Sequence, residues 1–150
     1  MLKQACVADL KAERFDRSKS HLVVTMRFDP RFLRKELRDE FIAEMAPEKE
    51  LLMDFNAAQK RLGDHNSSFA EVDYEQRFRM SDKAKAHLKR LAKLSNHKDV
   101  YLTCVCRVGE RCHREILMLI AHELYGCQID EVFHAYPIVM RRVVQFRSAE

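Results

Sequence analysis

The sequence is poor in glycine and proline and has no tryptophan, with 3 Gly, 3 Pro and 0 Trp among 150 residues. Scarce glycine and proline exclude collagen-like and low-complexity chains, in which these residues dominate. No apolar run approaches the roughly 18 residues that a membrane-spanning helix needs, so no membrane partner is expected. The N-terminus, Met1–Cys6, lacks the charged-then-apolar order of a signal peptide, and we therefore expect a cytoplasmic protein.

A large excess of charge is also missing, because 27 basic residues face 23 acidic ones, for a net charge of +4. This mild excess suits a small anionic ligand and falls short of the basic footprint of a committed nucleic-acid binder. The 5 cysteines are an odd count in a chain that is long enough to form a hydrophobic core. Reduced thiols therefore fit better than a disulfide framework.

Alternating strand and helix patterns predict one compact α/β domain over residues 1–150, with a short, mostly parallel sheet and helices on both faces. The predicted strands are Lys3–Leu10, His21–Met26, the run from Val100 to Cys104, and Ile129–Ala135. The predicted helices are Leu33–Glu44, Pro47–Leu62 stopped by Gly63, Asp82–Leu94 with Ser81 as N-cap, and Ile116–Leu124 stopped by Gly126. Glu13–Ser20 and Asp64–Ser68 are predicted loops, and Val139–Phe146 fits either a strand or a helix.

The segment Val100–Arg114 contains the strongest candidate site, because three cysteines, a histidine and three arginines gather where a strand turns into a helix. The backbone amides and the dipole at a helix N-terminus favour anions and lower the pKa of a nearby thiol. Cys112 is therefore the predicted reactive thiol, with His113 to orient or deprotonate it. Cys106 at the strand end is the second candidate, whereas Cys104 fits either the core or a resolving partner.

Arginines at two strand ends are candidates for binding a phosphate or carboxylate, which arginine reads with two parallel hydrogen bonds. Arg107, Arg111 and Arg114 surround the cysteine loop. Arg27 and Arg31 follow the strand His21–Met26, and they reach the same sheet edge if that strand runs parallel to the central one.

A metal centre is an alternative, since Cys104, Cys106, Cys112 and His113 could supply four sulfur and nitrogen ligands. The spacing is not that of the usual ligand pairs, and adjacent Cys112 and His113 point about 100° apart on a helix. The sequence therefore predicts neither a metal nor another cofactor. Cys6 and Cys127 lie outside the charged cluster and are interpreted as structural.

One pattern in the sequence resembles the domain-of-unknown-function 488 family (DUF488). It consists of Leu102-Thr103-Cys104, a gap of seven residues after Cys104, and the triplet Cys112-His113-Arg114. Further similarity lies in Arg27-x-x-Pro30-Arg31, in the helix start Ala46–Leu51 and in Tyr74–Phe78, so that the resemblance covers about residues 2 to 135. It implies a compact α/β fold and no particular reaction. The chain differs from the family pattern at Cys106, where members often carry Glu.

Cys106, four residues and Arg111 also resemble the active-site loop of rhodaneses, in which such a loop curls around a sulfur-borne anion. This weaker resemblance implies Cys106 as nucleophile and Arg111 as the residue that closes the anion site. A tyrosine-phosphatase loop would need five intervening residues instead of four.

Together, these patterns predict an anion-binding pocket, formed by residues 104–114 and the turn 27–31, in a monomer or homodimer. A thiol-dependent enzyme acting on a nucleotide or another phosphorylated small molecule is the first hypothesis. The alternatives are a non-catalytic nucleic-acid-binding module, a rhodanese-like sulfur transferase and a metal-binding protein. The sequence leaves open whether the protein is an enzyme at all.

Overall fold

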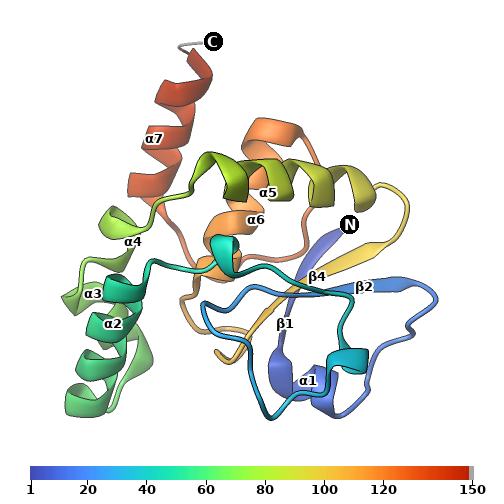
Figure 1. The fold of residues 1–150 in the computed structure, drawn as a ribbon. Helices are drawn as coiled ribbons and strands as arrows, with labels where there is room; N and C mark the ends of the chain where they lie inside the picture. The colour runs from blue at the N-terminus through green and yellow to red at the C-terminus, as the bar shows by residue number, and fades with distance from the viewer. Residues whose placement is uncertain (149–150) are drawn as a thin grey trace.

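The computed structural model describes residues 1–148 and is built on a four-stranded sheet (Figure 1). The strands follow the order β1-β4-β2-β3, and every neighbouring pair is parallel. Their bounds are β1 (Leu2–Cys6), β2 (Ser20–Val24), β3 (Glu40–Phe41) and β4 (Asp99–Cys104). The expected α/β class with a mostly parallel sheet is therefore confirmed.

The bounds of the helices are α1 (Val7–Lys11), α2 (Lys49–Leu62), α3 (His65–Glu71), α4 (Tyr74–Arg77), α5 (Asp82–Leu94), α6 (His113–Tyr125) and α7 (Pro137–Ser148). Helix α6 packs on one face of this sheet with α5 beside it, the short helix α1 covers the other face, and α2, α3, α4 and α7 lie to one side (Figure 1). Two 3-10 turns, η1 (Lys35–Leu37) and η2 (Ala43–Met45), flank β3. The larger core cluster lies between the sheet and α2 to α7, and the smaller one lies beneath α1 and η1.

The alternation of side chains along β4 decides which face receives the cysteines. Val100 and Leu102 are fully buried in the larger core cluster, and Cys104 follows them at the same two-residue period. Because β2 runs parallel to β4, with Val24 opposite Thr103, both strands end at the same sheet edge. This parallel pairing, on which the expected proximity of the turn 27–31 and the cysteine loop depended, is confirmed.

The predicted helix over Leu33–Glu44 is wrong, although its apolar residues are buried as expected. Its backbone amides bond to β2 instead: Asp39 N donates to Leu22 O at 2.8 Å, and Ile42 N donates to Val24 O at 2.9 Å. These bonds create the two-residue strand β3, because pairing with an exposed sheet edge outweighs the helical periodicity.

The predicted strand Ile129–Ala135 is also wrong, since only Ile129 forms an isolated parallel bridge, with Leu2. Further along, Phe133 N donates to the Glu115 carboxylate at 2.6 Å, and Glu131 N donates to Asp130 Oδ1 at 2.8 Å. These amides are satisfied by carboxylates, so no ladder continues. The expected strand–helix–strand unit over 99–135 is therefore absent, and β4 pairs with β1 and β2.

Two further boundaries differ from expectation, and one segment that was left open is resolved. Asp64 caps α3 by accepting from Ser67 N at 2.9 Å, so Asp64–Ser68 starts a helix and is not a loop. The opening strand ends at Cys6, where α1 begins, and the ambiguous segment Val139–Phe146 lies within α7. The caps at Ser81, Gly63 and Gly126 are confirmed, with both glycines left-handed. Within residues 1–148, every helix is too short or too polar to cross a bilayer.

Glu40 on β3 is expected to make stability depend on pH. Its carboxylate accepts two hydrogen bonds from Arg90, at 2.7 and 3.1 Å, and lies 2.5 Å from His21 Nε2. Burial raises the pKa of Glu40, but these hydrogen bonds outweigh burial and lower it overall. A carboxyl whose pKa is lowered by folding stabilises the protein above its unfolded pKa, and this contribution is lost as pH falls.

Glu40→Gln should therefore lower the free energy of unfolding by about 1 kcal/mol at neutral pH. The difference from the parent should shrink toward zero as the pH falls below about 4. Urea unfolding across this range measures both effects. Glu36→Gln is the matched control, because Glu36 and its partner Arg34 are both about two-thirds exposed. A Glu40→Gln difference that stays constant with pH would contradict the assignment.

Candidate functional site

A pocket of about 540 Å³ opens at the edge where β2 and β4 end. Its lining includes the three cysteines of the predicted site, together with His113, Arg27, Arg107 and Arg111. The opposite wall comes from α2 and α3 and from the start of α4, which supply Phe55, Phe69, Tyr74, Asn56 and Gln59. A volume of this size is typical of small-molecule sites.

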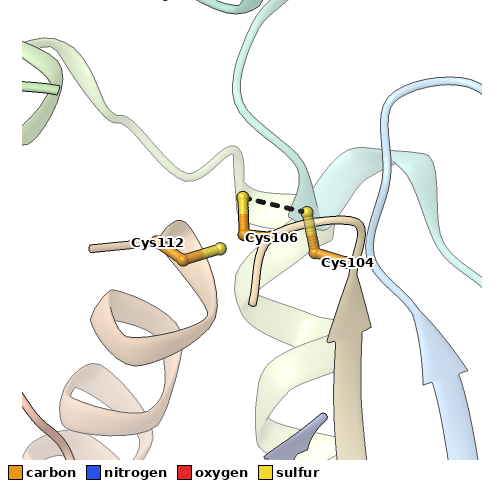
Figure 2. Close-up of side chains that lie close together, drawn as sticks. All are labelled: Cys104, Cys106 and Cys112. Atoms are coloured by element: carbon orange, nitrogen blue, oxygen red, sulfur yellow. Dashed lines mark hydrogen bonds between the residues drawn. The ribbon is translucent and has the colours of Figure 1, made fainter. Parts of the chain in front are cut away.

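Three thiols meet at the pocket floor (Figure 2). Figure 2 shows Cys104 at the tip of β4, Cys106 on the loop that follows and Cys112 at the start of α6. The Cys104 thiol donates to Cys106 Sγ at 3.8 Å, and all three sulfurs lie within 4.8 Å of one another. Cys104 and Cys112 are buried, and Cys106 is partly exposed. The described thiols are all free.

The three thiols differ in their affinity for a proton. Burial raises the pKa of Cys112, but hydrogen bonds from the other two thiols and the charges of His113 and Arg114 hold it well below its ordinary value. A hydrogen bond with Cys106 lowers the pKa of Cys104, but interaction with Cys112 and burial raise it to about 12. Hydrogen bonds with Cys104 and Cys112 raise the pKa of Cys106. Of the three thiols, Cys112 therefore has the lowest pKa and gives up its proton most readily.

The imidazole of His113 is fixed beside Cys112. Its Nε2 lies 2.7 Å from Thr25 O, a carbonyl that can only accept, so Nε2 carries a hydrogen. Nδ1 then faces Cys112 Sγ at 3.5 Å and can accept the thiol proton. Thr25 is itself held at the end of β2, where its hydroxyl donates to Thr103 O at 3.0 Å. The two strands therefore set the tautomer of His113.

Arg114 lies beneath the cysteine loop and is fully buried. Its guanidinium donates to the carbonyls of Ala5, Cys106 and Arg107 at 2.6, 2.8 and 3.1 Å. Burial lowers the pKa of Arg114, but the nearby cysteines outweigh burial and raise it. Arg114 thus ties β1 to the loop and places a positive charge close to the thiols. It is not among the residues that line the pocket.

A buried pair of a carboxylate and a hydroxyl, Glu115 and Tyr136, supports the start of α6. The Glu115 carboxylate is fully buried and accepts from Tyr136 Oη at 2.7 Å, from Phe133 N and from Gln4 Nε2 at 3.1 Å. The Tyr136 hydroxyl in turn lies 3.3 Å from Cys112 N, from which it accepts. Burial and Glu115 raise the pKa of Tyr136, so its hydroxyl stays protonated.

The loop between Cys106 and Cys112 is held by hydrogen bonds from several segments. Arg107 N donates to the Glu110 carboxylate at 2.8 Å, and Arg111 N donates to Asn66 Oδ1 at 3.0 Å. Gly109, at a φ of 103°, takes a conformation that suits glycine. The amides of Arg107 and Arg111 therefore have partners inside the protein.

The predicted arginines occupy different places. Arg27, Arg107 and Arg111 line the pocket, and the Arg111 guanidinium also stacks on Phe69 and Tyr136. Arg31 is exposed on its turn and does not line the pocket. The structure thus brings three of the five predicted arginines to the thiols.

Several residues of the site carried no recognised signal in the sequence. His65 bonds to Arg111 O at 2.6 Å from α3, a segment that the sequence analysis treated as loop. Three more residues support the site through contacts with residues far away in the sequence: Thr25, Tyr136 and Glu115. Glu115 had the most accessible clue, because a carboxylate on the apolar face of a helix needs buried hydrogen-bond partners.

The comparison with protein families gives a match that spans residues 6–123. The matching model is DUF488-N3a, described as the active DUF488-N3 subclade. No curated protein and no solved structure matches the chain. The match includes the whole cysteine loop, both of the strands that position it and most of α6. Because it covers most of the sequence, the protein belongs to the DUF488 family, in the DUF488-N3a subclade.

Proposed function

We propose that the protein is a thiol-dependent enzyme that acts on a small anionic molecule, with Cys112 as its nucleophile. The observation that carries this proposal is the pairing of Cys112 Sγ with His113 Nδ1 at 3.5 Å on the floor of the pocket. A thiol beside a base that is itself oriented by a third group is the usual arrangement of an activated nucleophile. Here the orienting group is the carbonyl of Thr25.

In the proposed reaction, Cys112 Sγ forms a bond to an electrophilic centre of the ligand, and the bond between that centre and the leaving group breaks. The thiol proton passes to His113 Nδ1, which returns the proton to the leaving group. Arg27, Arg107 and Arg111 bind the anionic part of the ligand, since guanidinium groups pair well with phosphate and carboxylate. We propose no ligand contact for Arg31, which lies away from the pocket, or for Arg114, which is buried beneath the loop.

The pocket walls favour a phosphorylated molecule that carries a planar ring, such as a nucleotide. Phe55, Phe69 and Tyr74 offer aromatic surface, and Asn56 and Gln59 offer amide groups that can both donate and accept. The arginines lie on the loop side of the same pocket. A nucleotide of moderate size would fill a volume of about 540 Å³.

Alkylation of the native protein tests the role of the Cys112–His113 pair. At neutral pH, iodoacetamide should label Cys112 faster than the buried Cys127, as read by mass spectrometry of each cysteine. His113→Gln should slow the labelling of Cys112 by about 10-fold or more, because glutamine keeps a donor toward Thr25 O and lacks Nδ1. Equal labelling of Cys112 in both proteins would remove His113 from the proposal.

The same assay tests the anion site. Inorganic phosphate should slow the labelling of Cys112 more than sodium chloride of equal ionic strength. Arg111→Ala should weaken this protection, whereas Arg31→Ala is the matched control and should leave it intact. Protection that is equal with both salts would indicate screening alone and would contradict a phosphate site.

A further inference from the structure

The sulfur atoms of Cys104, Cys106 and Cys112 are spaced as in a metal–thiolate centre. Zinc binds thiolate sulfur at about 2.3 Å in tetrahedral geometry, which places two sulfurs about 3.8 Å apart. The Cys104 and Cys106 sulfurs are 3.8 Å apart, and all three lie within 4.8 Å of one another. The Cys112 sulfur lies within 4.8 Å of the other two and must approach each of them by at most about 1 Å to reach this spacing.

The charge around the cluster also suits a thiolate centre. Among the described residues, no carboxylate forms an ion pair with Arg114, whose buried guanidinium donates only to carbonyls and whose Nε has no partner. Burying a charge without compensation is costly. Three thiolates around a divalent ion carry a net charge of −1, which matches the single positive charge of Arg114.

The three cysteines border a space that could hold a fourth ligand. Cys104, Cys106 and Cys112 all line the pocket, so the free position of a tetrahedral ion would face that space. Among the described residues, the group of ligand atoms that lie within 4.8 Å of one another consists of these three sulfurs and does not include a nitrogen of His113. Three protein ligands with one open position are the pattern of zinc sites that exchange their fourth ligand.

We propose that Cys104, Cys106 and Cys112 bind one Zn²⁺ ion, with the fourth coordination position open to the pocket. Three Zn–S bonds form, the protons still held by the sulfurs leave to solvent, and no electron is transferred. Zinc then occupies the electron pair with which Cys112 would attack a ligand. This consequence rests on the proposed function: the zinc-bound protein is inactive as a thiol nucleophile, and removal of zinc restores it.

Titration of the purified, metal-free protein with Zn²⁺ tests the proposal, with a chromophoric chelator as competitor. One ion should bind per chain, and Co²⁺ in its place should give the near-ultraviolet thiolate-to-cobalt absorption of a three-sulfur site. Cys106→Ser should weaken zinc binding by about 100-fold or more, since even the loss of an outer partner costs a ligand set 10- to 100-fold. Because Cys106 is partly exposed, this variant is the one most able to fold.

Cys127→Ser is the matched control, because Cys127 is a buried cysteine outside the cluster and its loss should leave zinc binding unchanged. Circular dichroism checks that each variant is folded. Zinc binding that survives in folded Cys106→Ser and Cys112→Ser would overturn the proposal. The absence of stoichiometric binding to the parent protein would overturn it equally.

Alkylation with and without zinc separates this inference from the proposed function. Stoichiometric Zn²⁺ should block the labelling of Cys112, and a chelator should restore it. If zinc does not bind while labelling of Cys112 remains His113-dependent, only the metal site is wrong. If zinc binds but labelling of the metal-free protein depends neither on His113 nor on phosphate, the proposed thiol-dependent activity is wrong and the proposed zinc site is supported.

Discussion

Replacing Arg114 with alanine is expected to lower the free energy of unfolding by about 4 kcal/mol, the largest effect of any substitution proposed for this protein. The change removes one donor from each of three carbonyls, those of Ala5, Cys106 and Arg107, of which Arg107 O keeps a hydrogen bond from Glu110 N. It also leaves a cavity where one of the largest fully buried side chains had been. Both costs add, because neither water nor another side chain can replace the planar guanidinium there.

Urea unfolding followed by circular dichroism measures this loss. Arg114→Lys should recover part of the stability, since an ammonium keeps the charge and donates to fewer of the carbonyls. Arg31→Ala serves as the control and should change stability by less than about 0.5 kcal/mol, because Arg31 is exposed. If Arg114→Ala and Arg31→Ala were equally stable, the buried guanidinium would not tie β1 to the loop.

Replacing Glu115 with glutamine is expected to cost about 2 to 3 kcal/mol, although the side-chain volume hardly changes. The carboxylate now accepts three hydrogen bonds, from Tyr136, Phe133 and Gln4. A glutamine amide has a donor in place of one of these two acceptor atoms, so either Phe133 N and Gln4 Nε2 face a donor or the Tyr136 hydroxyl loses its acceptor. Thermal and urea unfolding of the parent and the variant give the difference.

Tyr136→Phe is the matched comparison for Glu115→Gln, because it removes one hydroxyl from the same cluster and leaves the other two bonds to Glu115. Its cost should be near 1 kcal/mol. A Glu115→Gln protein that is no less stable than Tyr136→Phe would show that the carboxylate is not the centre of this cluster.

The sequence predicted correctly those parts of the fold whose conformation depends on interactions between residues close together in the chain. The caps at Ser81, Gly63 and Gly126 are side-chain or backbone signals that act within one helical turn. The segments around β3 and Ile129 were predicted wrongly because their partners lie elsewhere in the chain. Asp39 finds a carbonyl of β2, and Phe133 finds the carboxylate of Glu115. Such tertiary contacts leave no local pattern.

The candidate site shows the same division. The sequence placed Cys112, His113 and Cys106 at a strand-to-helix turn, and the structure brings these residues together at one pocket. The sequence left Cys104 open between the core and a resolving partner, and the structure places it in the lining of the same pocket. Arg114 was predicted beside a ligand because its charge was visible in the sequence, whereas its three carbonyl partners were not.

The short strand β3 also bears on how the protein behaves at high concentration. A sheet edge with unpaired amides is a template for pairing with another chain. Here one edge is a strand of only two residues that carries the charged Glu40, and the other edge, β1, is partly covered at Leu2 by residues 128–130. Neither offers a long, flat ladder, so we expect the folded protein to resist edge-to-edge aggregation.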